Sequence, residues 1–457
     1  MSVAETSHVP NGVAHLIPLS LNQEFLCAFD KGRPEGAFSD RHTMVQGWRV
    51  GGAVNLDTLQ GALDDVVARH EVLRTEIVRG AGPRYQEIHP AGRPRLTVRD
   101  LSGVAPDARD RAAEELVNEA DAGEYSVEEL PHLRAILGRF DDGDAVLVLV
   151  VHHTASDAWS LQVLIRDVAT CYAARRGHGP APQPGQYQEF ATWQHQSMGD
   201  AHVVKALGYW REKLRGAQIL ALPTDRPRTD GVANTFAVHR FLVDAELTGA
   251  TLKFANAMRS SPFMVLLAAY NILAHKRTGA TDIVVPTFTS GRYQERFFDS
   301  VGPFFNFVPL RTDLAGCQTS GEVLQRTRRT CMEAYSNDIP FPLVVNEAPD
   351  LVAPFADPAR SVVAFELLQS AAPMEAEAIG DLTYSEIRRR LLSQPVAADI
   401  PDGALWAMDV LPSGEMVGSL KFNSNLFDES TVVDLVAEFR QVLRNLVAGP
   451  DVPVQQI

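Results

Sequence analysis

The sequence has few cysteines, no long hydrophobic run and fewer basic than acidic residues. Its 4 cysteines show no CxxC spacing, so we expect reduced thiols, neither a disulfide framework nor a zinc site, and we predict no metal. No apolar run approaches the ~18 residues that a transmembrane helix requires. The 42 basic and 57 acidic residues give a net charge of −15, which argues against nucleic acid or an anionic membrane as a partner.

The remaining composition is typical of a globular protein, with 45% hydrophobic and 22% charged residues. Residues 1–12 are polar and contain no basic segment leading into an apolar one, so we expect no signal peptide and a cytoplasmic location. The clearest linker is 175–185, where prolines and glycines occur without periodicity. We therefore predict an N-terminal unit over residues 1–178 and a C-terminal unit over residues 179–457.

The most informative stretch is a short apolar run that ends in polar residues. Residues 146–151 are all aliphatic, which predicts a strand buried on both faces. His152 and His153 end this strand, Asp157 follows a turn, and an amphipathic helix begins near Ser160. Because successive side chains of a strand point to opposite faces, one histidine should face a cleft and the other the packed interior.

These residues allow a structural and a catalytic interpretation. Taken singly, each is more often a satisfied structural group, and Asp157 can cap the helix or pair with a buried arginine. A histidine at the end of a buried strand can also act as a general base, because its ordinary pKa lies near neutrality. Two catalytic patterns fit: HHxxxD, with His153 and Asp157, and the HxxxxD of glycerolipid acyltransferases, with His152 and Asp157.

Hydrophobic periodicity predicts elements along the rest of the chain. We expect helices near 56–67, 100–121, 130–137, 161–172, 209–214, 263–275 and 430–446, and strands near 283–288 and 418–427. Two arginine clusters, 326–329 and 388–390, lie on stretches that we expect to be helical. Such clusters are usually solvated helix faces, although they stand out in an acidic chain.

Seven segments, in order, resemble the core motifs of the condensation domains of nonribosomal peptide synthetases, over nearly the whole chain. They are Leu19–Phe25 (SxAQxRL, with only Gln23 clearly matching), Arg69–Thr75 (RHExLRT), His152–Ser160 (HHxxxDGWS, with Ala158 for glycine), Tyr187–Trp193 (YxDYAxW), Gly302–Arg311 (GPFVNTLPLR), Asp338–Phe341 (DxPF) and Gly418–Thr431 (a closing strand and LFDxxT). The missing membrane segment and these further motifs weigh against the glycerolipid acyltransferase interpretation.

Neighbouring families of the same fold fit less well. Epimerisation domains typically have Trp directly after the Ser of this motif, whereas here Trp159 precedes Ser160, as in condensation domains. The DFGWG motif of plant-type acyltransferases is absent, as are an adenylation segment and a GGxS-type attachment serine. The resemblance is therefore to a free-standing condensation enzyme, of the kind that acts in enediyne and other natural-product pathways.

The resemblance implies an α/β (α+β) fold: two chloramphenicol-acetyltransferase-like lobes in a V-shaped pseudo-dimer, with an active-site tunnel between them. It implies an acyltransferase that takes an acyl or aminoacyl group from the phosphopantetheine thioester of a separate acyl or peptidyl carrier protein. A small-molecule hydroxyl or amine acceptor would then give an ester or an amide, with no cofactor bound to the enzyme itself. The alternative is a catalytically silent module of the same fold that recruits a carrier or a partner.

The family's catalytic residues correspond here to His153, as base or as positioning group, with His152 in packing or in supporting hydrogen bonds. Asp157 would hold the loop by pairing with a buried arginine, for which the family favours Arg74 and Arg292 is the alternative.

The resemblance also implies residues on the substrate side. These are Ala158, Trp159, Ser160 and Asn306. Alanine in place of the motif glycine implies either a backbone conformation that alanine tolerates or a narrower channel. Since carrier proteins are acidic, one of the two arginine clusters would supply the docking patch.

Overall fold

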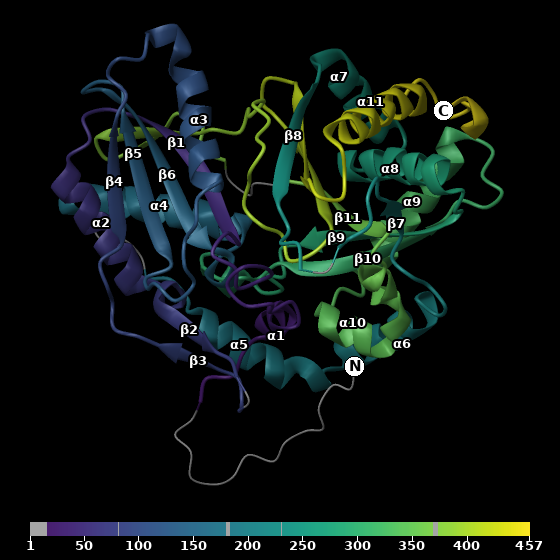
Figure 1. The fold of residues 1–457 in the computed structure, drawn as a ribbon, viewed down its shortest axis with the longest axis horizontal. Helices are drawn as coiled ribbons and strands as arrows, with labels where there is room; N and C mark the ends of the chain where they lie inside the picture. The colour runs from purple at the N-terminus through teal and green to yellow at the C-terminus, as the bar shows by residue number, and fades with distance from the viewer. Residues whose placement is uncertain (1–15, 81, 180–182, 230, 369–372) are drawn as a thin grey trace.

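The protein consists of two halves that lie side by side, each built around a β-sheet (Figure 1). A computed structural model describes residues 16–80, 82–179, 183–229, 231–368 and 373–457. The polar leader 1–12 and part of the predicted linker, residues 180–182, lie outside the described residues. Among the helices that are described, none has the length and apolarity needed to cross a membrane.

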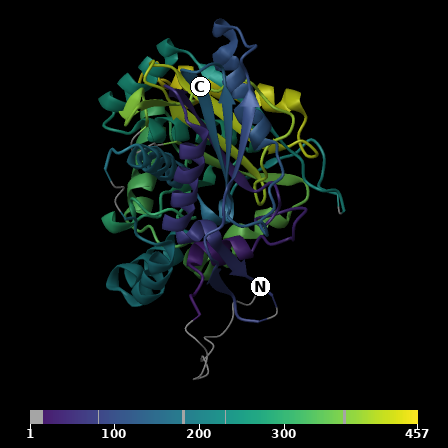
Figure 2. The same ribbon diagram turned by 90° about the vertical axis from the view of Figure 1, so that its left-hand side faces the viewer.

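The sheet of the N-terminal half has six strands. Their order is β12 (Glu377–Ile379), β13 (Leu382–Glu386), β1 (Thr43–Gly51), β6 (Asp144–His152), β5 (Leu133–Arg139) and β4 (Arg95–Asp100). Helices α2 (Leu56–Arg69) and α4 (Ala158–Arg175) share one core with this sheet, and α3 (Arg109–Asp121) shares another (Figure 2). A short hairpin of β2 (Thr75–Val78) and β3 (Tyr85–Ile88) lies beside them.

Strand β6 is apolar throughout because both of its faces are covered. Leu147, Leu149 and Val151 pack in the core with α2 and α4, whereas Val148 and Val150 pack in the core with α3. Thr43 of β1 pairs with His152, so the end of β6 is fixed in register against β1. The predicted buried strand is thereby confirmed.

The sheet of the C-terminal half has five strands. Their order is β7 (Ala221–Pro223), β11 (Arg360–Leu367), β14 (Ala404–Val410), β15 (Met416–Asn423) and β8 (Phe236–Val243). Strands β9 (Asp282–Thr289) and β10 (Asn306–Asp313) form a separate antiparallel pair. The helices of this half are α6 (Ala201–Lys213), α7 (Ala245–Ala257), α8 (Pro262–Thr278), α9 (Ser320–Tyr335), α10 (Phe341–Glu347) and α11 (Glu429–Leu446).

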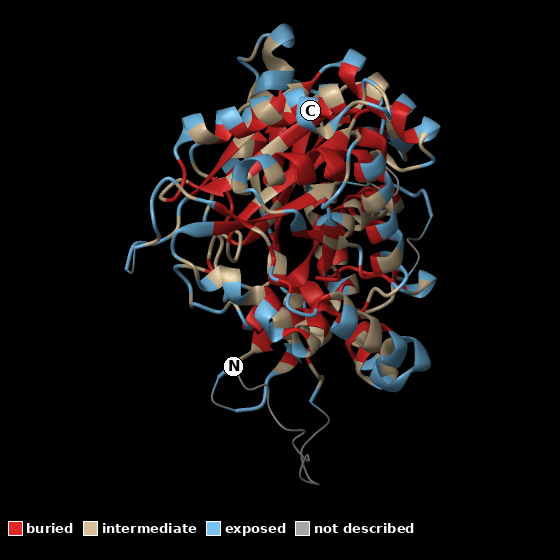
Figure 3. Ribbon diagram, turned by 90° about the vertical axis from the view of Figure 1, so that its right-hand side faces the viewer, coloured by how far each residue is buried: buried red, intermediate tan, exposed pale blue. Residues whose placement is uncertain are grey.

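Helix α8 lies in the interior of this half, as its nearly uniform apolar sequence predicts. Ser261 caps its N-terminus and Gly279 ends it in a left-handed conformation. The outer helices carry exposed residues on their solvent sides, while the strands between them are buried (Figure 3).

The two halves exchange segments. Strands β12 and β13 come from the C-terminal half of the chain, and β13 pairs with β1. Tyr187 and Phe190 of α5 (Tyr187–Gln196) belong to the core of α2 and α4. The division at residues 178 and 179 stays a prediction, and the sheet of the N-terminal half draws strands from both sides of it.

Three predicted elements are wrong. Residues 130–137, expected to be helical, contain the start of β5, because a short apolar run fits a strand between β4 and β6 as well as it fits a helix. The expected helix 100–121 begins only at Arg109, since residues 95–100 form β4. Residues 388–390 follow β13 without helical structure.

Candidate active site

His153 lies where β6 ends, in a single 3-10 turn (His153–Ala155). Its backbone N–H donates to the carbonyl oxygen of His42 at 2.9 Å. Its ring stacks on the ring of His42, with centroids 4.7 Å apart, and meets the ring of Phe305 edge-on at 5.0 Å. The imidazole is therefore held between residues of the two halves, and it stays partly exposed.

The hydrogen bonding of His153 defines its tautomer. Nδ1 lies 2.8 Å from the carbonyl oxygen of Ser156, and a carbonyl can only accept, so Nδ1 carries the hydrogen. Nε2 then has a free lone pair, and none of the described residues hydrogen-bonds to it. Burial lowers the pKa of His153, so the neutral form predominates at pH 7. A neutral ring with a free Nε2 lone pair has the properties of a general base that can accept a proton from a substrate.

His152 points the other way and uses both ring nitrogens internally. Nε2 donates to the carbonyl oxygen of Ser39 at 3.0 Å, and Nδ1 accepts from the backbone N–H of Thr154 at 3.3 Å. The residue is 2% exposed, and burial lowers its pKa to about 3. His152 thus supports the turn that carries His153 and has no nitrogen left for a substrate.

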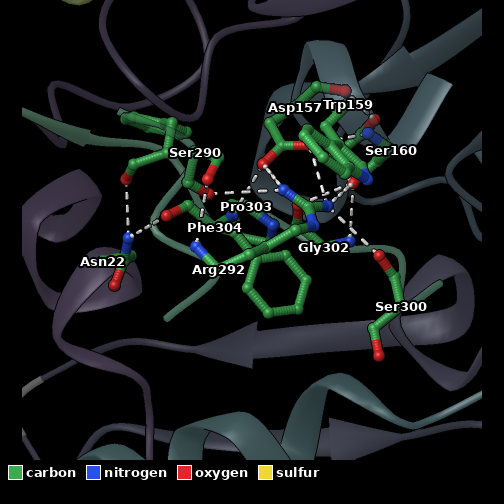
Figure 4. Close-up of polar contacts among 12 residues, drawn as sticks. Asn22, Asp157, Trp159, Ser160, Ser290, Arg292, Ser300, Gly302, Pro303 and Phe304 are labelled. Atoms are coloured by element: carbon green, nitrogen blue, oxygen red, sulfur yellow. Dashed lines mark hydrogen bonds and ion pairs between the residues drawn. The ribbon is translucent and has the colours of Figure 1, made fainter. Parts of the chain in front are cut away.

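Asp157 joins the two halves through Arg292. Nη1 of Arg292 donates to Oδ2 of Asp157 at 2.8 Å and Nη2 donates to Oδ1 at 3.2 Å, and both side chains are buried (Figure 4). The same carboxylate accepts from the N–H of Ser160, as the N-cap of α4, and from the N–H of Phe304. Asp157 is therefore committed to holding the loop.

The prediction that Arg74 is the arginine that pairs with Asp157, which the family favoured, is wrong. Its guanidinium donates to the carbonyl oxygen of His89 and lies 4.0 Å from Glu71. Arg74 sits in the 3-10 turn before β2, and both of these partners lie within the N-terminal half: Glu71 in the same turn and His89 directly after β3. Arg292 reaches Asp157 because Gly291 turns the chain with a φ of 61°.

Two of the four residues expected on the substrate side are fully engaged elsewhere. Ser160 has no exposed surface; its Oγ donates to Asp157 and accepts from the N–H of Gly302 at 3.0 Å. Asn306, at 4% exposed, donates to Asp338 and to the carbonyl oxygen of Ile339. Ser160 thus links the two halves, whereas Asn306 binds only within the C-terminal half. Buried polar groups that satisfy each other in this way leave no atom for a ligand.

The other two residues lie at the start of α4. Ala158 is exposed and is the first residue of that helix, a conformation that alanine adopts without strain. Trp159 donates from its indole N–H to the carbonyl oxygen of Phe298 at 2.9 Å and stacks against the Arg292 guanidinium. Of the four residues expected on the substrate side, only Ala158 has an exposed side chain that makes no hydrogen bond within the described chain.

Sequence reasoning missed the residues that tie the outer motifs to this site. Asn22 of α1 (Leu21–Cys27) donates to the carbonyl oxygens of Phe304 and Phe305 (Figure 4). Tyr187 donates from its hydroxyl to the carbonyl oxygen of Pro303 at 3.0 Å. His42 packs on His153 and lies outside every motif. Asn22 could have been found as a polar residue within a mainly apolar motif. Nothing in the sequence indicated that His42 lies at the site.

The two-half fold and a histidine at the end of β6 define a chloramphenicol-acetyltransferase-like protein. The chain belongs to the condensation-domain family, whose model matches residues 13–457. Chondramide synthase cmdD of Chondromyces crocatus is 31% identical over 100% of this chain, which corresponds to 11% of that synthase. Phosphinothricin tripeptide synthetase PhsC of Streptomyces viridochromogenes is 32% identical over 95% of this chain and 39% of its own length. The chain thus spans a small part of these relatives.

Solved structures show the same fold. The crystal structure of SgcC5 protein from Streptomyces globisporus, in complex with (R)-(-)-1-(2-naphthyl)-1,2-ethanediol and sucrose, has a TM-score of 0.92. It is 47% identical, and the match covers 95% of this chain and 100% of that one. The X-domain from teicoplanin biosynthesis is 22% identical with a TM-score of 0.78, over 98% of each chain, and shows the fold alone.

Proposed function

We propose that this protein is an acyltransferase that moves an acyl or aminoacyl group from a carrier-bound phosphopantetheine thioester to a hydroxyl or amine acceptor. The observation that carries this proposal is the state of His153: Nδ1 is fixed on Ser156, and Nε2 is free on a neutral ring. The family forms amide and ester bonds. The aryl diol bound to SgcC5 favours a hydroxyl acceptor, and hence an ester product.

His153 would act on the acceptor, because a thioester is already activated. Its Nε2 accepts the hydroxyl proton while the acceptor oxygen attacks the thioester carbonyl. The new C–O bond forms, the C–S bond breaks, and the leaving pantetheine thiolate takes up the proton from His153. An amine acceptor depends less on the base, so His153 would then serve mainly to orient it. The supporting ion pair of Asp157 and Arg292 keeps the turn in place.

The donor would arrive on a separate acidic carrier protein, and the charge pattern favours one docking face. Arg388 and Arg389 are paired with Asp409 and Glu415, and Arg390 donates to Asn118, so this cluster is already engaged. On α9, Arg326 and Arg328 donate, among the residues that the structure describes, only to backbone carbonyl oxygens, and Arg329 is exposed. Guanidinium groups without a carboxylate partner remain available to an acidic surface, so we assign docking to Arg326–Arg329.

Product analysis tests the proposal. Purified protein is mixed with carriers loaded with a set of acyl and aminoacyl groups and with paired hydroxyl and amine acceptors, and the products are examined by mass spectrometry. The proposal predicts His153-dependent ester with the hydroxyl acceptor. Carrier binding without any product would instead favour the recruitment module. The enediyne-pathway likeness stays a prediction that the identity of the accepted donor would test.

A further inference from the structure

His42, directly before β1, is fixed in position by the segment that joins β13 to β14. Its Nδ1 lies 3.1 Å from the carbonyl oxygen of Asp399, and a carbonyl can only accept, so Nδ1 carries the hydrogen. Asp399 binds the same turn twice more: its backbone N–H donates to the carbonyl oxygen of Arg41 at 2.8 Å, and its carboxylate accepts from the Ser39 hydroxyl at 2.7 Å. The ring of His42 is therefore held in one orientation.

The ring of His42 stays neutral. The residue is 2% exposed, and its Nε2 is buried without a hydrogen-bond partner among the described residues. A proton at Nε2 would leave an unpaired N–H and an uncompensated charge in the interior. Burial, together with the neighbouring His153 and His152, accordingly lowers the pKa of His42 well below its ordinary value. Of the two stacked rings, the partly exposed His153 is the one that can take up a proton during a reaction.

The flat face of this neutral ring lies against the ring of His153. The ring centroids are 4.7 Å apart and the ring planes differ by only 16°. The backbone N–H of His153 also donates to the carbonyl oxygen of His42 at 2.9 Å, which fixes the spacing of the two residues. The face of an aromatic ring carries excess electron density and attracts a cation within about 6 Å of its centroid. A protonated His153 would thus be stabilised by this contact more than a neutral one.

We propose that His42 is a positioning residue that stabilises the protonated form of His153 with the face of its own neutral ring. This inference rests on the proposed function, in which His153 holds the acceptor's proton until the thiolate leaves. The contact stabilises that protonated state and leaves Nε2 of His153 open to the acceptor. The other charged or titratable groups that act on the two rings are His152, Asp157 and Lys421, and the test leaves all three unchanged.

Matched variants at residue 42 separate the ring face from the hydrogen bond. His42→Leu and His42→Phe are both apolar and both lose the bond to Asp399, but only His42→Phe keeps a flat ring. His42→Met and His42→Tyr repeat the comparison should either variant not fold. The control is His239→Leu, which removes a ring that stacks on Phe241 in the C-terminal half. The pKa of His153 is measured by NMR of labelled histidine rings, with the signal assigned from His153→Gln, and this measurement needs no substrate.

The pKa of His153 should be lower in His42→Leu than in His42→Phe by about 0.4–1.5, which corresponds to a two- to thirtyfold change in proton affinity. His239→Leu should leave the pKa at the wild-type value. In turnover with a carrier-bound donor, kcat with a hydroxyl acceptor should fall by a similar factor from His42→Phe to His42→Leu. The fall should be smaller with an amine acceptor, which needs the base less.

Equal pKa values of His153 in His42→Leu and His42→Phe would overturn the inference, because the ring face would then contribute nothing. An equal fall in kcat with the two acceptors would also overturn it, since His42 would then act only on the structure of the site. If the difference in pKa is found but the wild type transfers no acyl group, the contact between the rings stands and the proposed function fails.

Discussion

The Arg292 guanidinium donates to both carboxylate oxygens of Asp157, at 2.8 and 3.2 Å, and so ties the C-terminal half to the first turn of α4. Asp157 also accepts from the backbone N–H groups of Ser160 and Phe304. The hydrogen bonds that Asp157 makes within the protein thus explain why the HHxxxD motif has an acidic residue at this position, without any contact to a substrate. His153 depends on this joint because it lies four residues before Asp157.

Asp157→Asn should destabilise the protein by about 3–5 kcal/mol, since it leaves the Arg292 charge buried without a counter-charge. The matched control is Asp65→Asn, which breaks an exposed pair with Arg175 and should cost about 1 kcal/mol or less. Urea denaturation measures both values. Equal stability of the two variants, with activity lost only in Asp157→Asn, would show that Asp157 acts in catalysis.

Gly291→Ala should displace Arg292. It should also lower the free energy of unfolding more than an alanine does at a left-handed glycine that has open space around it. Both Gly291 and Gly316 have positive φ angles, of 61° and 75°, so an alanine costs about 1–2 kcal/mol at either position. At Gly291 the new Cβ would also overlap the carbonyl oxygen of Phe304, whereas Gly316 has open space around it. We expect about 1–3 kcal/mol of further loss for Gly291→Ala, measured by denaturation. Similar losses at both positions would refute the steric argument.

Stability should fall as the pH drops below about 6.5, where an unfolded histidine takes up a proton. Burial lowers the folded-state pKa of His132 to about 4 and that of His152 to about 3. Between these pKa values and pH 6.5 the unfolded chain binds more protons than the folded protein. Each of the two histidines therefore lowers the free energy of unfolding by about 1.4 kcal/mol for each pH unit by which the pH falls. Denaturation at pH 7.5, 6.0 and 5.0 measures the slope, which should be shallower in His132→Gln. A stability that does not change over this range would contradict the neutral histidine cluster.

Charge reversal on α9 should weaken carrier docking without slowing the chemistry. The variant Arg326→Glu, Arg328→Glu, Arg329→Glu on α9 should raise KM for the loaded carrier and leave kcat nearly unchanged, since these arginines would bind the carrier and take no part in the proton transfer. The control reverses three exposed arginines of the N-terminal half, Arg93, Arg99 and Arg111, with the same change in net charge. If both variants raise KM equally, or if free pantetheine thioester reacts as well as the carrier, the assigned face is wrong.

The sequence predicted what depends on local pattern. The uniformly aliphatic run 146–151, the buried helix around Ala268 and the opposite directions of His152 and His153 follow from periodicity and were confirmed. Residues 130–137 were assigned to a helix because a short apolar run does not distinguish a helix from a strand between two partners.

The sequence could not predict which residues meet across the halves. Arg292 was only an alternative partner of Asp157, because the turn at Gly291 and the loop carrying Phe304 define that contact. Ser160 and Asn306 were expected on the substrate side because they belong to motifs, yet the fold buries them in hydrogen bonds. Motifs locate residues near a site and do not tell which of them keep a free atom.

The most direct test of the account compares kcat for wild type, His153→Gln and the control His89→Ala, with a carrier-bound donor and matched hydroxyl and amine acceptors. His89 directly follows β3 and is partly exposed, so its loss should leave kcat unchanged. The proposal that Nε2 of His153 acts as the base predicts that kcat of His153→Gln falls at least ~100-fold with the hydroxyl and less with the amine, at unchanged Tm. A variant that keeps more than about a tenth of the wild-type kcat with the hydroxyl acceptor would contradict the account.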